Sequence, residues 1–512
     1  ASGMRFPLIK IIAVLALLLG SCASLQAETT AETYAVVVTK DTQARKDWAA
    51  VVEVLQKKHG AKVVIVPGRL EDCAAQLKDL QLRYVCFVAR PEEISTDGIR
   101  AINKLSRTMD DDPYVDFLWG VITGWMAEDA LRIAKTSEPL IVRTSLSTTG
   151  VNLGLVDQGL IISDGKKGTW SSRKNGTSTN GPCDALTSAA MFREYWDEND
   201  VDMLVTSSHA TQVNLEMPFS LGAVVCASNR LYALDQTNFF RWVRNVSRGT
   251  AAGGAWFATP SYQKYREDWS AITKSPMLRA STKPKVYLAA GNCLIADTME
   301  TQDSMVVTWL SAGGVSQFVG YTVSTWYGKG GWGTLDMWTT PAGHITLSEA
   351  VFLNNQRILW RLKEENPHLL QVSFKNEDMR SMKNREVFEE VAKAPKEKQR
   401  DQLGMVYDRD VLVLYGDPKW PATFHPAKQQ DRLSWTWKND TDGSATLTLR
   451  ARKDFSSDAF PILLPRRMAN AQVLSGGDLS PMLNDEFILF SKLKLQPDHE
   501  YVVKIGPARP KA

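Results

Sequence analysis

Short apolar runs alternate with amphipathic stretches along most of the chain, and this rhythm predicts an α/β fold. Residues 34–39 (YAVVVT) form a β-branched run typical of a buried strand. The next stretch, which Gly60 ends, repeats apolar residues at helical spacing. Its apolar positions are Trp48, Val51, Val52 and Leu55. Residues 63–66 form another buried strand, and the order strand, helix, strand favours a parallel sheet.

The same pattern continues to about residue 415. We predict further strands at 84–89, 117–123, 160–162, 201–207, 285–290, 315–321 and 411–415. We predict further helices at 71–80, 99–107, 127–135, 185–196 and 305–310. Residues 164–182 are rich in Gly, Ser, Thr, Asn and Lys, which is the composition of an exposed loop. An alternative for this loop is a processing site that activates a latent enzyme.

Helical spacing disappears after about residue 429. Residues 433–437 and 445–449 alternate apolar and polar side chains, and turn signals separate such stretches. This pattern predicts a small antiparallel β-sandwich. We therefore expect an α/β domain over residues 31–426 and a sandwich domain over residues 427–512.

The first thirty residues have the layout of an export signal. We expect residues 1–3, ahead of Met4, to be a cloning remnant. The apolar run 11–19 is too short to span a bilayer as a mature helix but fits a signal peptide. Residues 19–22 (LGSC) resemble the bacterial lipobox, which implies that Cys22 carries lipid. The alternative is cleavage near Ala27, which would release a soluble secreted protein.

Composition and charge exclude several classes of protein. Hydrophobic residues make up 44% of the 512 residues and charged residues 23%, so the chain is neither disordered nor a multi-span membrane protein. There are 60 Lys and Arg against 57 Asp and Glu, a balance that does not favour binding of nucleic acid. We expect membrane contact only through the lipid anchor, in the bacterial cell envelope at the outer membrane. The oligomeric state stays open.

Six cysteines in a chain of this length are too few for a disulfide scaffold, so each is considered singly. Free cysteines are usually buried. Cys86 and Cys226 lie in apolar runs typical of a core, whereas Cys73 and Cys183 have no assigned role.

Cys293 and His209 each follow a predicted strand, at 285–290 and 201–207. Ligands of open α/β sheets bind beyond the carboxyl ends of the strands. A thiolate beside an imidazole is a nucleophile for a carbonyl carbon, and neighbouring backbone N–H groups can bind the oxyanion that forms. Each residue alone is more often structural, and the spacing of the two is by itself weak evidence for a catalytic dyad.

The segments around both residues resemble a known group of peptidases. TSSHA (206–210) and YLAAGNC (287–293) resemble the two signature segments of caspase-like cysteine peptidases. Further segments resemble the gingipain-like branch, namely YAVVVTK, HGAKVVIV, DDDPYVDFLWGVITGWMAEDALRIA, GGVSQFVGYTVSTW and VLYGDP. The resemblance covers most of residues 34–420. It implies a caspase-like α/β sandwich with a mostly parallel sheet, followed by an immunoglobulin-like domain.

The resemblance implies a nucleophilic Cys293, an acid/base His209, and an oxyanion hole made of the Ala210 and Cys293 N–H groups. The family has Gly after the histidine, so Ala210 is a departure. Alanine keeps the N–H, and the hole survives if the φ of this residue is negative. The nearest downstream acid is Glu216, and no third, orienting residue is assigned.

By the same resemblance, Trp326 and Tyr327 line the pocket for the residue before the scissile bond. Residues 328–333 (GKGGWG) then form a flexible covering loop. The equal alternative is that both aromatic side chains belong to the core.

Asp110, Asp111 and Asp112 form the densest carboxylate cluster. Calcium is common in the resembled family and suits oxygen ligands, but acidic runs are usually solvated turns and these lack an EF-hand's spacing. We expect no required cofactor or catalytic metal, since six scattered histidines form no zinc motif.

The sequence therefore predicts an exported cysteine endopeptidase that acts on protein or peptide substrates. The alternative from another class is a cell-surface protein that binds peptides or glycans on a peptidase-like fold, without turnover. Ala210 is compatible with that alternative, and the clustered Trp326, Trp332 and Trp338 would supply its binding platform.

Overall fold

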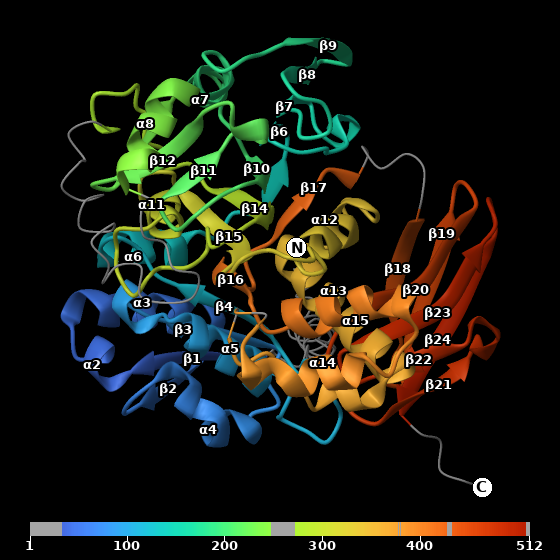
Figure 1. The fold of residues 1–512 in the computed structure, drawn as a ribbon. Helices are drawn as coiled ribbons and strands as arrows, with labels where there is room; N and C mark the ends of the chain where they lie inside the picture. The colour runs from blue at the N-terminus through green and yellow to red at the C-terminus, as the bar shows by residue number, and fades with distance from the viewer. Residues whose placement is uncertain (1–32, 247–271, 377, 379, 427–432, 508–512) are drawn as a thin grey trace, which may run out of the picture.

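The computed structural model describes residues 33–246, 272–376, 378, 380–426 and 433–507. The predicted signal peptide and the lipobox with Cys22 lie outside the described residues. The predicted boundary between the two domains falls at the last described residue before a gap, since residues 427–432 are also outside the description. The described chain combines a large mixed α/β unit with smaller antiparallel sheets (Figure 1). Within it, no helix combines the length and apolar character that crossing a bilayer requires.

Twelve strands form the central sheet, in the order β2-β1-β3-β4-β16-β15-β14-β10-β6-β7-β8-β9. Their bounds in that order are Lys62–Val66, Tyr34–Thr39, Tyr84–Val88, Leu118–Ile122, Leu412–Gly416, Val315–Tyr321, Lys285–Asn292, Met203–Ser208, Thr144–Ser147, Gln158–Ile162, Thr169–Lys174 and Thr177–Pro182. One parallel run comprises β2, β1, β3 and β4, and another comprises β15, β14, β10, β6 and β7. Between them, β16 lies antiparallel to β15. The predicted mostly parallel sheet is thus confirmed.

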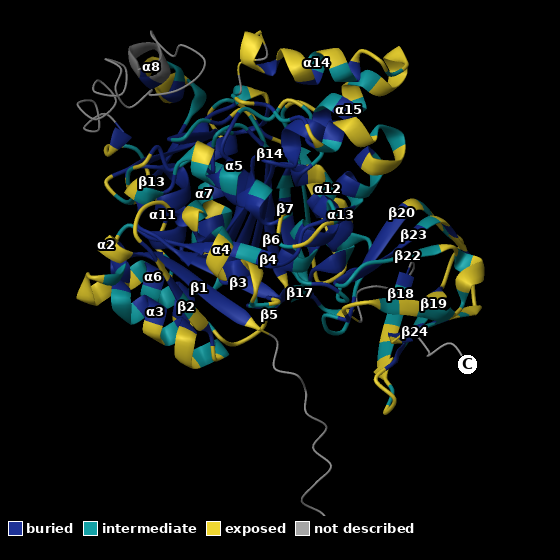
Figure 2. Cartoon of the chain, turned by 90° about the horizontal axis from the view of Figure 1, so that it is seen from below, coloured by how far each residue is buried: buried dark blue, intermediate teal, exposed yellow. Residues whose placement is uncertain are grey.

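The apolar side chains of the inner strands are almost completely buried. This burial explains why apolar runs in the sequence predict these strands. Every residue of β1, β3, β15 and β16 is buried. Parallel strands covered on both faces have this composition. Figure 2 shows these strands as a dark interior, whereas the exposed positions gather on the surrounding helices and turns.

The helices have these bounds: α2 Lys40–Gln43, α3 Lys46–His59, α4 Ala74–Lys78, α5 Thr96–Leu105, α6 Ala127–Lys135, α7 Ser188–Glu198, α8 Gln236–Val246, α11 Met305–Ser311, α12 Gly331–Thr339, α13 Leu347–Glu365, α14 Arg385–Val391 and α15 Lys396–Asp408. Helix α3 buries the four predicted apolar positions and ends at Gly60, which has a φ of 62°. A left-handed residue at this position is the usual role of glycine. The predicted end of this helix at Gly60 is confirmed.

Residues 164–182 differ from the prediction of a loop, because most of them form the hairpin β8–β9 at one end of the sheet. Asn175 and Gly176 both have positive φ, at 50° and 84°, which suits a tight hairpin turn. No residue of either strand is buried. The hairpin therefore has no apolar face, and apolar spacing could not reveal it.

Two small sheets were not predicted. Strands β11 (Asn214–Glu216), β12 (Ala223–Ala227) and β13 (Arg230–Leu234) form an antiparallel sheet directly after β10. Strands β17 (Ala422–Phe424) and β5 (Leu140–Val142) pair in parallel and connect the end of the α/β unit to its middle.

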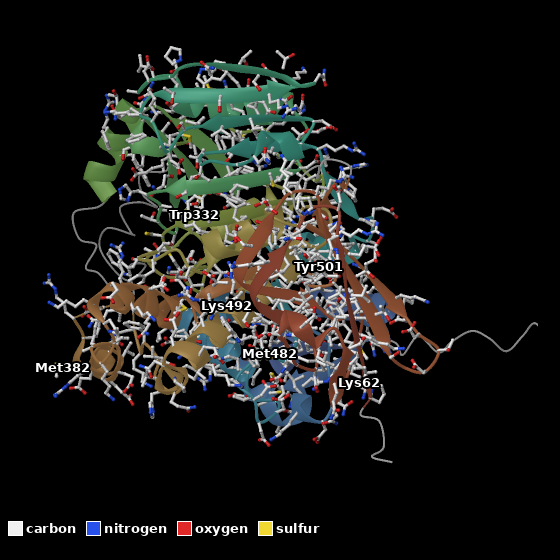
Figure 3. The ribbon with its side chains drawn as sticks, turned by 90° about the vertical axis from the view of Figure 1, so that its right-hand side faces the viewer. Lys62, Trp332, Met382, Met482, Lys492 and Tyr501 are labelled. Carbon is white, nitrogen blue, oxygen red and sulfur yellow. The ribbon has the colours of Figure 1, made fainter. Side chains whose placement is uncertain are left out.

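The C-terminal residues form two antiparallel sheets, as the alternating pattern predicts. The first contains β18 (Leu433–Asn439), β19 (Ala445–Ala451), β24 (Glu500–Pro507) and β21 (Ala471–Ser475). The second contains β20 (Phe455–Leu463), β23 (Phe487–Leu495) and β22 (Pro481–Leu483). Figure 3 views these strands from their own side and labels Met482, Lys492 and Tyr501 on them. The immunoglobulin-like assignment stays a prediction.

Buried contacts join these sheets to the α/β unit. The ring of Tyr114 meets that of Phe487 edge-on, with centroids 5.2 Å apart. Arg83 forms an ion pair with Glu486, and both side chains are almost inaccessible, at 4% and 2% exposure. Arg83 also donates to the carbonyl of Leu464 at 2.7 Å. The two parts therefore pack through a desolvated charge pair as well as apolar surface.

Candidate functional site

The site begins with the register of two neighbouring strands. β10 and β14 are parallel, and their last paired residues are Ser208 and Asn292. His209 and Cys293 are the next residues of the two strands. Adjacent strands lie about 4.8 Å apart. The sheet therefore delivers the predicted dyad residues side by side at one edge.

Asn292 links the two strand ends directly. Its side-chain Nδ2 donates to the Ser208 carbonyl at 3.0 Å, and its Oδ1 accepts from the Thr206 hydroxyl at 2.5 Å. The Thr206 and Tyr287 hydroxyls are bonded in turn, 3.0 Å apart. Asn292 is fully buried. The amide thus connects the residue before His209 to the residue before Cys293.

A β-bulge bends β14 just before the cysteine. Thr206 pairs with Ala289 but Ser207 pairs with Gly291, so Ala290 is an extra residue. The bulge is closely packed: a methyl group on Gly291 would lie 3.0 Å from Ser207 Cβ and 3.2 Å from Trp332 Nε1, and closer still to Ser207 Oγ. A side chain at position 291 would therefore push the strand ends apart.

Cys293 is half-buried, unlike the four other cysteines of the described chain, which are all buried. Its Sγ accepts a hydrogen bond from the Thr325 N–H at 3.2 Å, and the Thr325 hydroxyl donates to the Asn292 carbonyl at 3.0 Å. The next residue, Leu294, has a φ of 60° and donates its N–H to the Val323 carbonyl. The segment after β15 thus holds the turn that carries the thiol.

His209 is exposed and starts a tight excursion from the sheet. Its carbonyl accepts from Glu216 N–H at 2.9 Å, and Thr211 N–H donates to the Asn214 carbonyl at 2.9 Å. These two bonds flank the bridge between Ala210 and Leu215, which makes it a non-hydrogen-bonded antiparallel pair. In such a pair the N–H of each residue points away from the partner.

The N–H of Ala210 therefore faces away from β11. Ala210 is absent from the residues with positive φ, so the condition under which alanine keeps a usable N–H at this position is met. The Glu216 side chain is engaged by the Ser220 hydroxyl at 2.5 Å. Its role as an orienting acid stays unassigned.

The two predicted pocket residues have different surroundings. Trp326 is exposed, at 55%, and Tyr327 is half-buried against Tyr407, with ring centroids 5.8 Å apart. Burial, followed by the charge of Asp408, raises the pKa of Tyr327. Trp326 is thus available to a ligand, whereas much of Tyr327 belongs to the packing against α15.

The predicted covering loop at 328–333 is well anchored. The carboxylate of Asp408 accepts from the Gly330 N–H at 2.8 Å and from the Tyr321 hydroxyl at 2.9 Å. The Tyr321 hydroxyl also accepts from the Gly331 N–H at 2.7 Å, and α12 begins at that glycine. Burial raises the pKa of Asp408 to about 6, against the effect of these hydrogen bonds. The prediction of a flexible loop is not supported by this packing.

Burial sorts the remaining cysteines. Cys86 and Cys226 lie in the core, as predicted, at 0% and 1% exposure. Cys73 is fully buried, which raises the pKa of its thiol to about 12. Cys183 is also buried, at 8%. These environments favour unreactive thiols.

The acidic cluster is tied into local structure. Asp110 accepts from the Asp112 N–H at 2.9 Å, and Asp112 accepts from Tyr114 N–H at 2.8 Å and Asn484 Nδ2 at 2.5 Å. Burial, with the nearby charges of Asp110 and Asp112, raises the pKa of Asp116 to about 8. Across the described residues, no group of three or more His, Cys, Asp or Glu has the arrangement of a metal site. Calcium stays an untested expectation.

Asn292, Thr325 and the bulge at Ala290 were not singled out from the sequence. The GNC triplet contained the signal for Asn292, because a buried amide directly before the cysteine must find partners on an adjacent strand. Thr325 could not be found in this way, since its contact depends on the path of the chain after β15.

Comparisons with known proteins add little to this geometry. No family model matches the chain, and no curated protein matches it. A solved structure described as "Structure of Protease" aligns with 92% of this chain and 94% of its own, at 8% identity and a TM-score of 0.40. At that TM-score the likeness carries no argument about family or activity. What this chain does must therefore be inferred from its own residues.

Proposed function

We propose that this protein is an exported cysteine endopeptidase that hydrolyses peptide bonds through a Cys293–His209 dyad. One observation supports it above the others: the register of β10 and β14, in which Ser208 pairs with Asn292 and the two candidate residues follow. The resemblance of TSSHA and YLAAGNC to caspase-like signature segments, with other segments like the gingipain branch, points the same way.

In the proposed reaction, His209 takes the proton of the Cys293 thiol and the thiolate attacks the peptide carbonyl carbon. The N–H of Thr325 donates a hydrogen bond to Sγ and so stabilises negative charge on the sulfur. The N–H groups of Ala210 and Cys293 bind the oxyanion of the tetrahedral intermediate. The orientation of the Ala210 N–H away from β11 supports this role.

The intermediate collapses to a thioester as the C–N bond breaks, and His209 gives its proton to the leaving amine. Water then loses a proton to His209 and attacks the thioester carbonyl. The C–S bond breaks, the acid product leaves, and the thiol is restored. This cycle requires no cofactor, and calcium would act only as a structural ion.

We further propose that Trp326 contacts the substrate residue before the scissile bond. Its side chain is exposed, and it directly follows Thr325, whose N–H bonds the sulfur of Cys293. Export through the signal peptide, with lipid on Cys22, would present this site in the bacterial cell envelope.

Mixtures of peptides with diverse sequences test the proposal. Cys293→Ala should lower cleavage at least about a thousand-fold and abolish labelling by a peptide with a thiol-directed electrophile. Cys183→Ala is the matched control, because it removes a thiol that is buried and distant in sequence. Cleavage that survives in Cys293→Ala would refute the assignment.

A binding protein without turnover is the second candidate. The exposure of Trp326 and Trp332, at 55% and 37%, favours it, as aromatic surfaces bind peptides and glycans. Trp338, the third residue of the predicted platform, is fully buried and is not part of that surface. In that case the unmodified protein would bind peptides without cleaving them, and Trp326→Ala would weaken binding while Cys293→Ala would not.

A further inference from the structure

A largely buried polar network joins the strand ends that carry the proposed dyad, and of its members only Thr325, through its N–H, enters the reaction steps above. It joins three segments that are far apart in the sequence: the ends of β10 and β14, and the segment after β15. Asn292 is its centre, with bonds to the Ser208 carbonyl and the Thr206 hydroxyl. Thr325 joins the third segment to the Asn292 carbonyl.

We infer that Asn292 is the positioning residue of the site: its amide fixes the strand end that carries His209 relative to the strand end that carries Cys293. This inference rests on the proposed function. Asn292 is not a catalytic residue, because the reacting atoms belong to its neighbour, and it acts through Ser208 and Thr206.

The geometry around the amide explains why a side chain is required here. The bulge at Ala290 interrupts the regular ladder between β10 and β14, and only two pairs, Ser207 with Gly291 and Ser208 with Asn292, continue beyond it. The bond from Nδ2 to Ser208 lies beyond that bulge, one residue before His209. It adds a side-chain link to the short stretch of ladder that remains beyond the bulge.

Burial makes the orientation of the amide specific. Nδ2 can only donate and Oδ1 can only accept, and the partners are a carbonyl and a hydroxyl respectively. Asn292 is fully buried, so water cannot replace a lost partner without disturbing the packing. Rotation of the amide would place Oδ1 against the Ser208 carbonyl, and the network therefore selects one arrangement.

Misplacement at this site should affect chemistry more than substrate affinity. An error of about 1 Å between reacting groups can cost about a hundred-fold in rate. Asn292→Ala should therefore lower kcat about ten- to a hundred-fold and leave KM within about two-fold. Asn292→Asp should be similarly impaired, because it places an oxygen against the Ser208 carbonyl.

Thr206 offers a matched pair of variants. Thr206→Val keeps the shape of the side chain but removes the hydroxyl that donates a hydrogen bond to Asn292 Oδ1. Thr206→Ser keeps that hydroxyl. We expect loss of kcat in the valine variant and recovery in the serine variant. Asn384→Ala is the remote control, since Asn384 is also a buried amide bonded to backbone, at Asn376 and Asp378.

The decisive measurement is the rate of Cys293 alkylation by iodoacetamide as a function of pH. In the unmodified protein, a thiol paired with imidazole should react well below the range of a free thiol, whose pKa is about 8.5. In Asn292→Ala and Thr206→Val this profile should move towards that of a free thiol. Asn384→Ala should keep the original profile, even if it is less stable.

The outcomes separate the two proposals. If Cys293→Ala still cleaves peptides, the proposed function fails. If Cys293→Ala is inactive while Asn292→Ala keeps both kcat and the alkylation profile, the proposed function stands and the positioning role is refuted. If Asn292→Ala does not fold, the two Thr206 variants decide in the same way, and equal activity of valine and serine would refute the role.

Discussion

Gly291→Ala should disturb the site through steric contacts with Ser207 and Trp332, and the energetic cost of these contacts can be worked out. The new methyl group would lie 3.0 Å from Ser207 Cβ and 3.2 Å from Trp332 Nε1, with Ser207 Oγ nearer than either. Real side-chain carbons keep about 3.5 Å or more from such atoms. Because Gly291 has no positive φ, backbone strain does not contribute. Overpacking of this kind costs about 1–3 kcal/mol in the free energy of unfolding.

Urea unfolding measures this loss, and a double-mutant cycle with Ser207→Ala assigns it. Removing the Ser207 hydroxyl removes the closest contact, so the double variant should recover about 1 kcal/mol relative to the sum of the single changes. Gly150→Ala is the control, because nothing lies within 4 Å of a methyl group at that position. It should change stability by less than about 1 kcal/mol.

Peptide cleavage should respond to the same contact, since a displaced strand end moves Cys293 away from His209. Gly291→Ala should be less active than its loss of stability alone explains, and Ser207→Ala should restore part of the activity. Equal stability of Gly291→Ala and the unmodified protein, or no recovery in the double variant, would refute the steric reasoning.

Three further outcomes follow from burial and charge. The pKa of Asp408 is raised to about 6, so its protonated form contributes stability that is present below the ordinary aspartate pKa of about 4 and is lost as the pH rises through 6. Urea unfolding should show the unmodified protein losing up to about 3 kcal/mol between pH 4 and 7 relative to Asp408→Asn. A difference between the two proteins that stays constant with pH would contradict this. Glu486→Ala should cost about 3–5 kcal/mol by removing the carboxylate that faces the buried Arg83 guanidinium, and thermal unfolding of the double variant Arg83→Met with Glu486→Leu should regain much of it. Thiol reagents followed by peptide mass mapping should modify Cys293 in the native protein well before Cys73, and equal rates would mean that the turn after β14 does not expose the thiol selectively.

Apolar spacing predicted most of the buried strands of the central sheet, although it did not reveal the largely buried helix α13 or the buried strand β6. The buried strands β1, β3, β14, β15 and β16 consist mainly of apolar residues, and their positions agree with the expectation to within about two residues. The place of His209 and Cys293 after two such strands was predictable for the same reason. That the two strands are neighbours was not, because strand order depends on contacts between distant segments.

Polar elements escaped prediction because they bury no apolar face. The hairpin β8–β9 contains the Asn175–Gly176 turn, which is a strong local signal, but its strands carry only small polar and charged side chains apart from Trp170. The excursion β11–β13 after His209 was missed for a different reason. Its first strand, β11, has only three residues, and the chain between 210 and 216 forms a bridge that no spacing rule describes.

The hairpin β8–β9 also determines how one end of the twelve-stranded sheet meets other molecules. A bare strand edge is a template on which a second chain can add, and aggregation often starts there. Here β9 has no buried position and ends in Pro182, which cannot donate a backbone hydrogen bond, and β8 beside it ends in the exposed Lys174. A second copy would gain no apolar contact by pairing along this strand. The polar composition that makes the hairpin hard to predict thus also leaves that end of the sheet without an apolar face that would hold a second chain against it.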